Sequence, residues 1–130
     1  MRCETMNEKQ CAKLLSREFA LAKSVYDNHI IENGMLNSHM FFGEINQRFM
    51  EEFKTDTTNA LAYFQFVEKM WKEGDDRVQL ILRHTVIEHL TDDPEIWQLF
   101  GQLISPEFKD FINNELLNHS EVWQEVTPLQ

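Results

Sequence analysis

Residues 75–90, DDRVQLILRHTVIEHL, decide how this chain folds. Val78 and Ile81 fall on one side of the helix that this stretch predicts, and Leu80 and Leu90 fall on another. A helix that is apolar over most of its circumference is usually covered by neighbours on several sides. We therefore expect this stretch to form a central helix.

The spacing of apolar side chains every three or four residues predicts further amphipathic helices around this one. They cover about 7–28, 37–54, 57–73, 94–103 and a last stretch that starts at 106. Gly34 and Gly74 are suited to end helices. Pro94 and Pro106 mark helix starts. Gly43 falls inside one predicted helix, and its lack of a side chain predicts a close contact with another helix.

These patterns predict an all-α fold class. No segment alternates between apolar and polar residues with a period of two, so no strand is expected. The chain has 130 residues, of which 42% are hydrophobic, which suits one domain with its own core. We predict a single compact antiparallel bundle of about six helices over residues 1–130, with an α-solenoid-like arrangement as the alternative. Short flexible ends are expected at 1–6 and 127–130.

The acidic residues are unevenly distributed. The chain carries 12 basic and 22 acidic residues, a net charge of −10, which argues against direct binding of nucleic acid. Residues 91–130 hold one basic and eight acidic residues, a net charge of −7, against −3 for residues 1–90. A dense acidic surface steers a basic partner toward it and speeds association.

We therefore expect a partner-binding surface in the C-terminal region, where aromatic residues among the acids could serve as anchors. The candidate residues are Asp92, Asp93, Glu95, Trp97, Glu107, Asp110, Glu115 and Trp123. The alternative is a solvated face with two acidic helix starts, whose aromatic residues belong to the core.

Enzymatic motifs are not found in the sequence. His84 and His89 flank Glu88 in a pattern that superficially resembles a metalloprotease helix, but five residues place them about 140° apart. We expect instead a His84–Glu88 pair on the surface, with His89 facing the core. No Glu-x-x-His pair, nucleophile elbow or glycine-rich phosphate loop occurs. We expect no catalytic residues, no metal, no cofactor and no enzymatic activity.

The expected location is the cytoplasm. Cys3 and Cys11 are too few for a zinc knuckle or a disulfide framework and are expected to be reduced thiols. No stretch approaches the ~20 apolar residues of a membrane span. Residues 1–20 lack the uninterrupted apolar run of a signal peptide.

Three motifs carry a family resemblance: FFGE at 41–44, FVEKMWKEGD at 66–75 and VIEHL at 86–90. With the helices around them, they make residues 38–112 similar to a family of small uncharacterised bacterial all-helical domains. These domains look like immunity proteins of polymorphic toxin systems, including contact-dependent growth inhibition. The resemblance implies an antitoxin that binds and blocks one cognate toxin, and it transfers no catalytic or contact residues.

The acidic balance is compatible with such a toxin inhibitor, because nuclease active sites are basic. We expect the partner to be a basic nuclease domain, bound through an acidic helical surface at the active site or at an exosite, with no direct contact to nucleic acid or membrane. The alternative is a helical adaptor or regulatory subunit of another protein. Glu68 and Glu88, which lie in the motifs, are expected to be semi-buried caps or ion-pair partners of Arg77 or Arg83.

Overall fold

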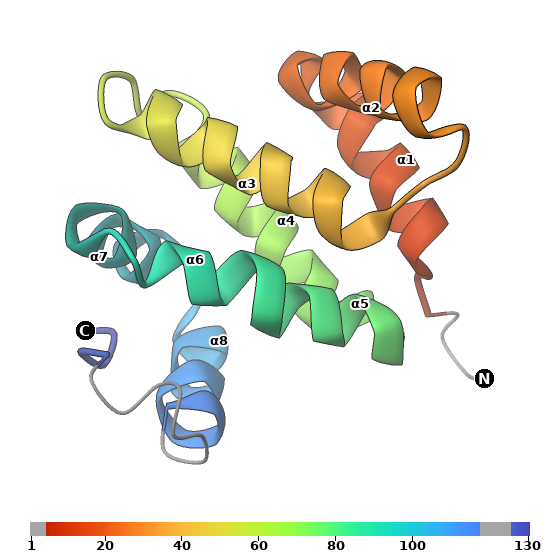
Figure 1. Cartoon of the computed structure of the whole chain (residues 1–130). Coiled ribbons are helices and arrows are strands. Elements are labelled where there is room, and N and C mark those ends of the chain that lie inside the picture. The colour runs from red at the N-terminus through yellow and green to blue at the C-terminus, as the bar shows by residue number, and fades with distance from the viewer. Residues whose placement is uncertain (1–4, 118–125) are drawn as a thin grey trace.

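The helix over residues 76–90 runs through the middle of the fold, in contact with helices from both sides (Figure 1). The computed structural model describes residues 5–117 and 126–130, which contain helices and no strand. The helices are α1 Glu8–Glu18, α2 Ala20–Asn33, α3 Ser38–Phe53, α4 Ala60–Glu73, α5 Asp76–Ile81, η1 Leu82–Ile87, α6 Glu88–Leu90, α7 Pro94–Leu103, α8 Pro106–Phe111 and η2 Ile112–Leu116. The predicted all-α fold is confirmed.

The central helix contains a π-helical segment, η1, between α5 and α6. In this wider turn the amide of Glu88 donates to the carbonyl of Arg83, five residues earlier. Leu82 and Ile87 are fully buried, because η1 packs against both α3 and α4. Leu80 points away from this packing and is 49% exposed. The expected central position is therefore correct, although one of the predicted apolar faces is partly open.

The sequence prediction of one helix over 7–28 is wrong, because the chain breaks at Phe19 into α1 and α2. Phe19 has extended backbone angles, φ −130° and ψ 124°. The break turns its ring into the core, where it meets Phe49 edge-on at 5.2 Å between centroids and also contacts Tyr63 and Phe66. Neither Gly nor Pro marks this position, so tertiary packing overrides a continuous helical pattern.

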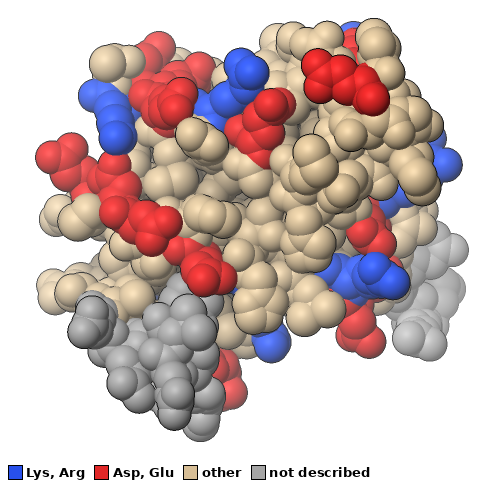
Figure 2. Space-filling model, in the orientation of Figure 1, with Lys and Arg blue, Asp and Glu red and all other residues tan. Residues whose placement is uncertain are grey.

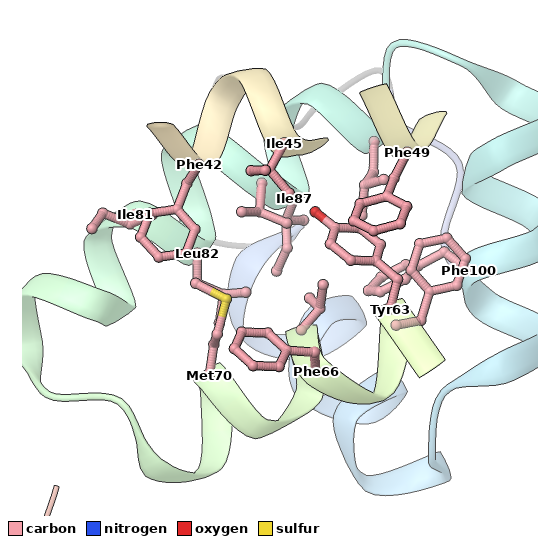
Figure 3. Packing of buried hydrophobic residues seen from close by; sticks show 14 of the residues in the cluster. Phe42, Ile45, Phe49, Tyr63, Phe66, Met70, Ile81, Leu82, Ile87 and Phe100 are labelled. Carbon is pink, nitrogen blue, oxygen red and sulfur yellow. The ribbon is translucent and has the colours of Figure 1, made fainter. Parts of the chain in front are cut away.

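Aromatic side chains fill the core between α3, α4 and η1 (Figure 3). Phe49 of α3 stacks on Tyr63 of α4 at 4.2 Å between ring centroids, a geometry that adds to the burial energy. Phe64 extends the contact to Phe100 of α7, edge-on at 5.1 Å. These contacts fix α3 and α7 relative to each other through α4.

One buried polar network links α3, α4 and η1. The hydroxyl of Tyr63 donates to Asn46 Oδ1 at 2.7 Å, and Asn46 Nδ2 donates to the carbonyl of Val86 at 3.2 Å. Asn46 is fully buried, and a buried amide without partners would destabilise the fold. The network therefore holds the π-helical segment in register against α3.

The predicted glycine and proline signals are found at helix ends. Gly34 ends α2 in the left-handed conformation, with φ 73°. Asp93 and Ser105 cap α7 and α8 just before Pro94 and Pro106. A Cβ at Gly43 would lie 3.5 Å from the Thr85 methyl group, so α3 does contact η1 there, at an ordinary van der Waals distance.

Both expected flexible ends include residues that contact the body of the protein. The amide of Asp75 donates to the carbonyl of Met6 at 2.9 Å, and the Met6 side chain is buried. Leu129, near the other end, is also buried. In the described parts of the chain, no helix has the length and apolar character needed to cross a bilayer.

Candidate functional site

A groove of about 780 Å³ lies between α3 and the segment where α6 ends and α7 begins. Figure 1 shows these two elements adjacent, with the start of α7 near the C-terminal end of α3. The lining residues are His39, Met40, Gly43, Glu44, Gln47, Met50, Glu51, Lys54, His89, Asp92 and Asp93. Two of the predicted partner-binding residues, Asp92 and Asp93, therefore line a concave surface. We call it the acidic groove.

The charge of the acidic groove is predominantly negative. Glu44 and Glu51 face it from α3, opposite Asp92 and Asp93. Among the described residues, Lys54 is the one Lys or Arg side chain in its lining. Figure 2 shows several acidic side chains, with basic ones among them, in the left part of the view, where Figure 1 shows α7 and the C-terminal end of α3. The low-dielectric walls of a groove strengthen such a field, and a basic group entering it would be attracted from a distance.

Glu95 extends the acidic edge beyond the groove. It lies in the first turn of α7 and lines a second hollow together with Lys54, Asp92 and Asp93. Its side chain is exposed. The three predicted residues at 92–95 are thus brought together in one place.

Asp93 has a structural role that limits its use in binding. Its Oδ1 accepts hydrogen bonds from the amides of Glu95 and Ile96, which caps α7, and its Oδ2 lies 3.3 Å from Lys54 Nζ. Partial desolvation raises the pKa of Asp93, but the amide of Ile96 and the charge of Lys54 outweigh it and hold the pKa below its usual value. The carboxylate is therefore largely occupied within the protein.

Two histidines line the acidic groove beside the π-helical segment. Nδ1 of His39 and Oγ1 of Thr85 form a hydrogen bond of 2.7 Å. Nδ1 of His89 donates to the carbonyl of Thr85 at 2.6 Å, which places its proton on that nitrogen. His89 is exposed, so the prediction that it faces the core is wrong. Its bond to the Thr85 carbonyl holds it at the groove instead. His84 and Glu88 pair at 3.9 Å, as predicted.

Glu107, Asp110 and Glu115 lie elsewhere. They are exposed on α8 and η2, which Figure 1 shows on the other side of the central helix from α3. The candidate residues of the sequence therefore form two separate acidic surfaces. Only the one at 92–95 borders the acidic groove.

Neither tryptophan of the predicted set is placed as an anchor of the acidic groove. Trp97 is 6% exposed, and its indole nitrogen donates to the carbonyl of Thr127 at 2.7 Å. It stacks on Phe100 at 5.6 Å, so it belongs to the core, which was the alternative interpretation. Trp123 lies outside the described residues.

The two motif carboxylates have structural partners. Glu68 accepts a hydrogen bond from the Ser105 amide at 2.9 Å and lies 3.1 Å from Lys72. Desolvation raises the pKa of Glu68, but the bonds from Ser105 and Lys72 outweigh it and lower the pKa overall. It is a semi-buried cap, as expected, paired with Lys72; Arg77 pairs with Glu8 instead.

Among the described residues, no group of three or more His, Cys, Asp or Glu side chains is arranged to hold a metal ion. Cys11 is fully buried, and this burial raises the pKa of its thiol to about 12, which makes it a poor nucleophile. Cys3 lies outside the described residues.

Sequence reasoning did not identify the wall of the groove that α3 provides. Glu44 and Glu51 recur at a spacing of seven residues, which places them on one helix face, and His39 lies near the start of the same helix. This spacing was visible in the sequence. The packing of that face beside residues 91–93 was not, because the two segments are about forty residues apart in the chain.

Fold and groove together define a small all-helical protein whose most distinctive surface is acidic and concave. The chain belongs to the family described as "Domain of unknown function (DUF7674)", whose model matches residues 12–121. Comparison with curated proteins and with solved structures gives no match. The description of the family assigns no activity, so the function has to be argued from the surface itself.

Proposed function

We propose that this protein is a non-enzymatic inhibitor that binds a basic partner protein in the acidic groove. The observation that carries the proposal is the convergence of Glu44 and Glu51 of α3 with Asp92 and Asp93, with Lys54 as the basic residue of the lining. Such a field favours cationic side chains, and Lys and Arg in a partner would be its ligands.

The lining also offers apolar contact. Met40 is 56% exposed at the groove, and Met50 lies further along the same helix. Methionine side chains are flexible and polarisable, so they adapt to varied partner surfaces. A binding site that combines apolar and charged side chains has the composition of a protein–protein interface.

The more specific form of the proposal is an immunity protein that neutralises a cognate toxin domain. It is supported by the motif resemblance over residues 38–112 and by the net charge of −10. A toxin that acts on nucleic acid binds phosphates through basic residues, and an acidic groove can occupy those residues in place of the nucleic acid.

The test is capture of the partner from the native host with two variants of equal charge change. The first carries Glu51→Lys and Asp92→Lys in the acidic groove and Glu95→Lys at its edge. The second carries Glu107→Lys, Asp110→Lys and Glu115→Lys on α8 and η2. Asp93 is left unchanged in both, because it caps α7.

The proposal predicts that the groove variant binds the partner about a hundredfold more weakly. Each new like-charge contact at the rim of an interface costs about 1 kcal/mol, and the variant introduces three of them. The control variant should retain it. Immunity further requires that the captured protein be toxic to the host and that co-expression with this protein restore growth. Equal binding by both variants would refute the role of the groove.

A second candidate function, a helical adaptor, is supported by a different surface. Ile31 and Met35 are 80% and 71% exposed at the end of α2 and in the connection to α3. Exposed apolar side chains that together form one patch often mark a protein contact. Ile31→Lys together with Met35→Lys should abolish partner capture if this surface is used, and should leave it unchanged if the acidic groove is used.

A further inference from the structure

Residues 126–130, Val-Thr-Pro-Leu-Gln, lie against α7, α8 and η2 as a non-helical segment. The side chains of the helices bind this segment mainly through its main chain. Trp97 Nε1 donates to the Thr127 carbonyl at 2.7 Å, and Lys109 Nζ donates to the main-chain oxygen of Gln130 at 2.9 Å. We call residues 126–130 the tail and the surface that holds it the tail groove.

Asn113 binds one residue of the tail twice. Its Nδ2 donates to the Leu129 carbonyl, and its Oδ1 accepts from the Leu129 amide, both at 2.8 Å. A side-chain amide can form hydrogen bonds with both the N–H and the C=O of one residue. It then takes the place of a neighbouring strand, which would form the same two bonds. This contact recognises an unpaired main chain, whatever the side chain at that position.

The leucine side chain supplies the selectivity. Leu129 is 6% exposed and packs over Gly101 of α7. A Cβ at Gly101 would lie 3.0 Å from the Leu129 Cδ2 atom, so the glycine leaves the room that the leucine fills. Main-chain hydrogen bonds give affinity and a side-chain pocket gives specificity, which is the division found in peptide-binding domains.

The tail does not fill the space beside it. A hollow of about 780 Å³ lies between the tail and the outer face of α7, lined from the helix side by Pro94, Trp97, Gln98 and Gln102. Its lining carries Asp92 as a charged side chain and otherwise polar or apolar groups. A longer extended peptide would find further contact there.

We propose that the tail groove is a peptide-binding site for an extended segment that carries a leucine, and that the tail is this ligand bound within the same chain. An extended segment of a partner protein with the same chemistry is the occupant that competes with it. Because the tail is tethered, its effective concentration is of the order of millimolar, so a free peptide binds weakly until the tail is displaced.

The test uses the full chain with Leu129→Ala. This substitution weakens binding of the tail to the tail groove and leaves the residues of the helices unchanged. The probe is a fluorescent Val-Thr-Pro-Leu-Gln peptide. We expect the variant to bind it at least about tenfold more tightly than the unmodified chain does, because the tethered competitor is weakened. The indole N–H resonance of Trp97 should shift in the variant and return to its original position when the peptide is added.

Two controls keep the result specific. A probe with alanine in place of leucine should not bind, and the Leu129→Ala chain with Asn113→Ala added should lose the original probe. Absence of probe binding to the Leu129→Ala chain, or binding that survives Asn113→Ala, would overturn the proposal. A concentration-dependent dimer of the unmodified chain that disappears in Leu129→Ala would assign the groove to a second copy, and would overturn the assignment to a partner peptide.

Discussion

The acidic groove and the tail groove lie on either side of the start of α7 and share one lining residue, Asp92. The first is lined by four carboxylates and one lysine, with most of its charged groups open to solvent. The second presents an indole, an amide and a glycine, and a segment of the same chain already occupies part of it. One helix thus borders two surfaces of different chemistry.

The chemistry of the surface changes along the length of α7. Asp93 and Glu95 stand at its first turn, where unpaired amides and the helix dipole favour acids. Trp97 and Gly101 lie on the face of the following turns, four residues apart, and hence on one side of the helix. The acidic side chains are therefore concentrated at the start of α7. The residues that contact the tail lie further along the same helix.

The largest expected difference between the two grooves is in how strongly salt weakens binding. Raising the ionic strength from 0.05 M to 0.5 M should weaken capture of the basic partner by about tenfold or more, because exposed charges are screened. Binding of the Val-Thr-Pro-Leu-Gln peptide to the Leu129→Ala chain should change by less than about twofold, since its contacts are main-chain and apolar. Titrations at both salt concentrations measure this, and equal salt dependence would contradict the comparison.

Asp93 should affect stability more than binding. Asp93→Ala removes the cap of α7 and the contact with Lys54, so we expect a loss of about 1 kcal/mol in the free energy of unfolding. Asp93→Asn keeps an acceptor oxygen and should cost less than half of that. Urea unfolding followed by circular dichroism gives both values. A loss of partner affinity in Asp93→Asn without loss of stability would place Asp93 among the binding residues instead.

Lowering the pH should have the smallest of these effects, a change in the free energy of unfolding. The folded-state pKa of Asp93 lies below its usual value, so its contribution to stability is present above about pH 4 and is lost as the pH falls through the lowered pKa. Asp93→Asn cannot titrate. The stability difference between the unmodified chain and Asp93→Asn should therefore shrink between pH 6 and pH 3, and a constant difference would show that the charge of Asp93 contributes nothing.

The helices were predictable from the sequence because their apolar residues recur at helical spacing. The break at Phe19 was not, since no Gly or Pro stands there and only the contacts with Phe49 and Tyr63 explain it. The π-helical segment η1 was equally hidden, because its sequence LRHTVI is compatible with an ordinary helix.

The candidate site was predictable only in part. The local excess of acids identified Asp92 and Glu95, and proline after an acid identified the start of α7. The number of acidic residues in 91–130 could not show that Glu107 lies on a different surface. Composition does not indicate which helices face each other. Residue type alone predicts Trp97 as an anchor, whereas in the structure its indole donates to the carbonyl of Thr127.

The proposed function requires that a basic partner cover the acidic groove. Hydrogen–deuterium exchange of the full chain, with and without the captured partner, tests this directly. We predict slower exchange in residues 39–54 and 89–96 when the partner is bound. Protection confined to α8 and η2, or to the end of α2 around Ile31, with none at residues 39–54, would contradict it.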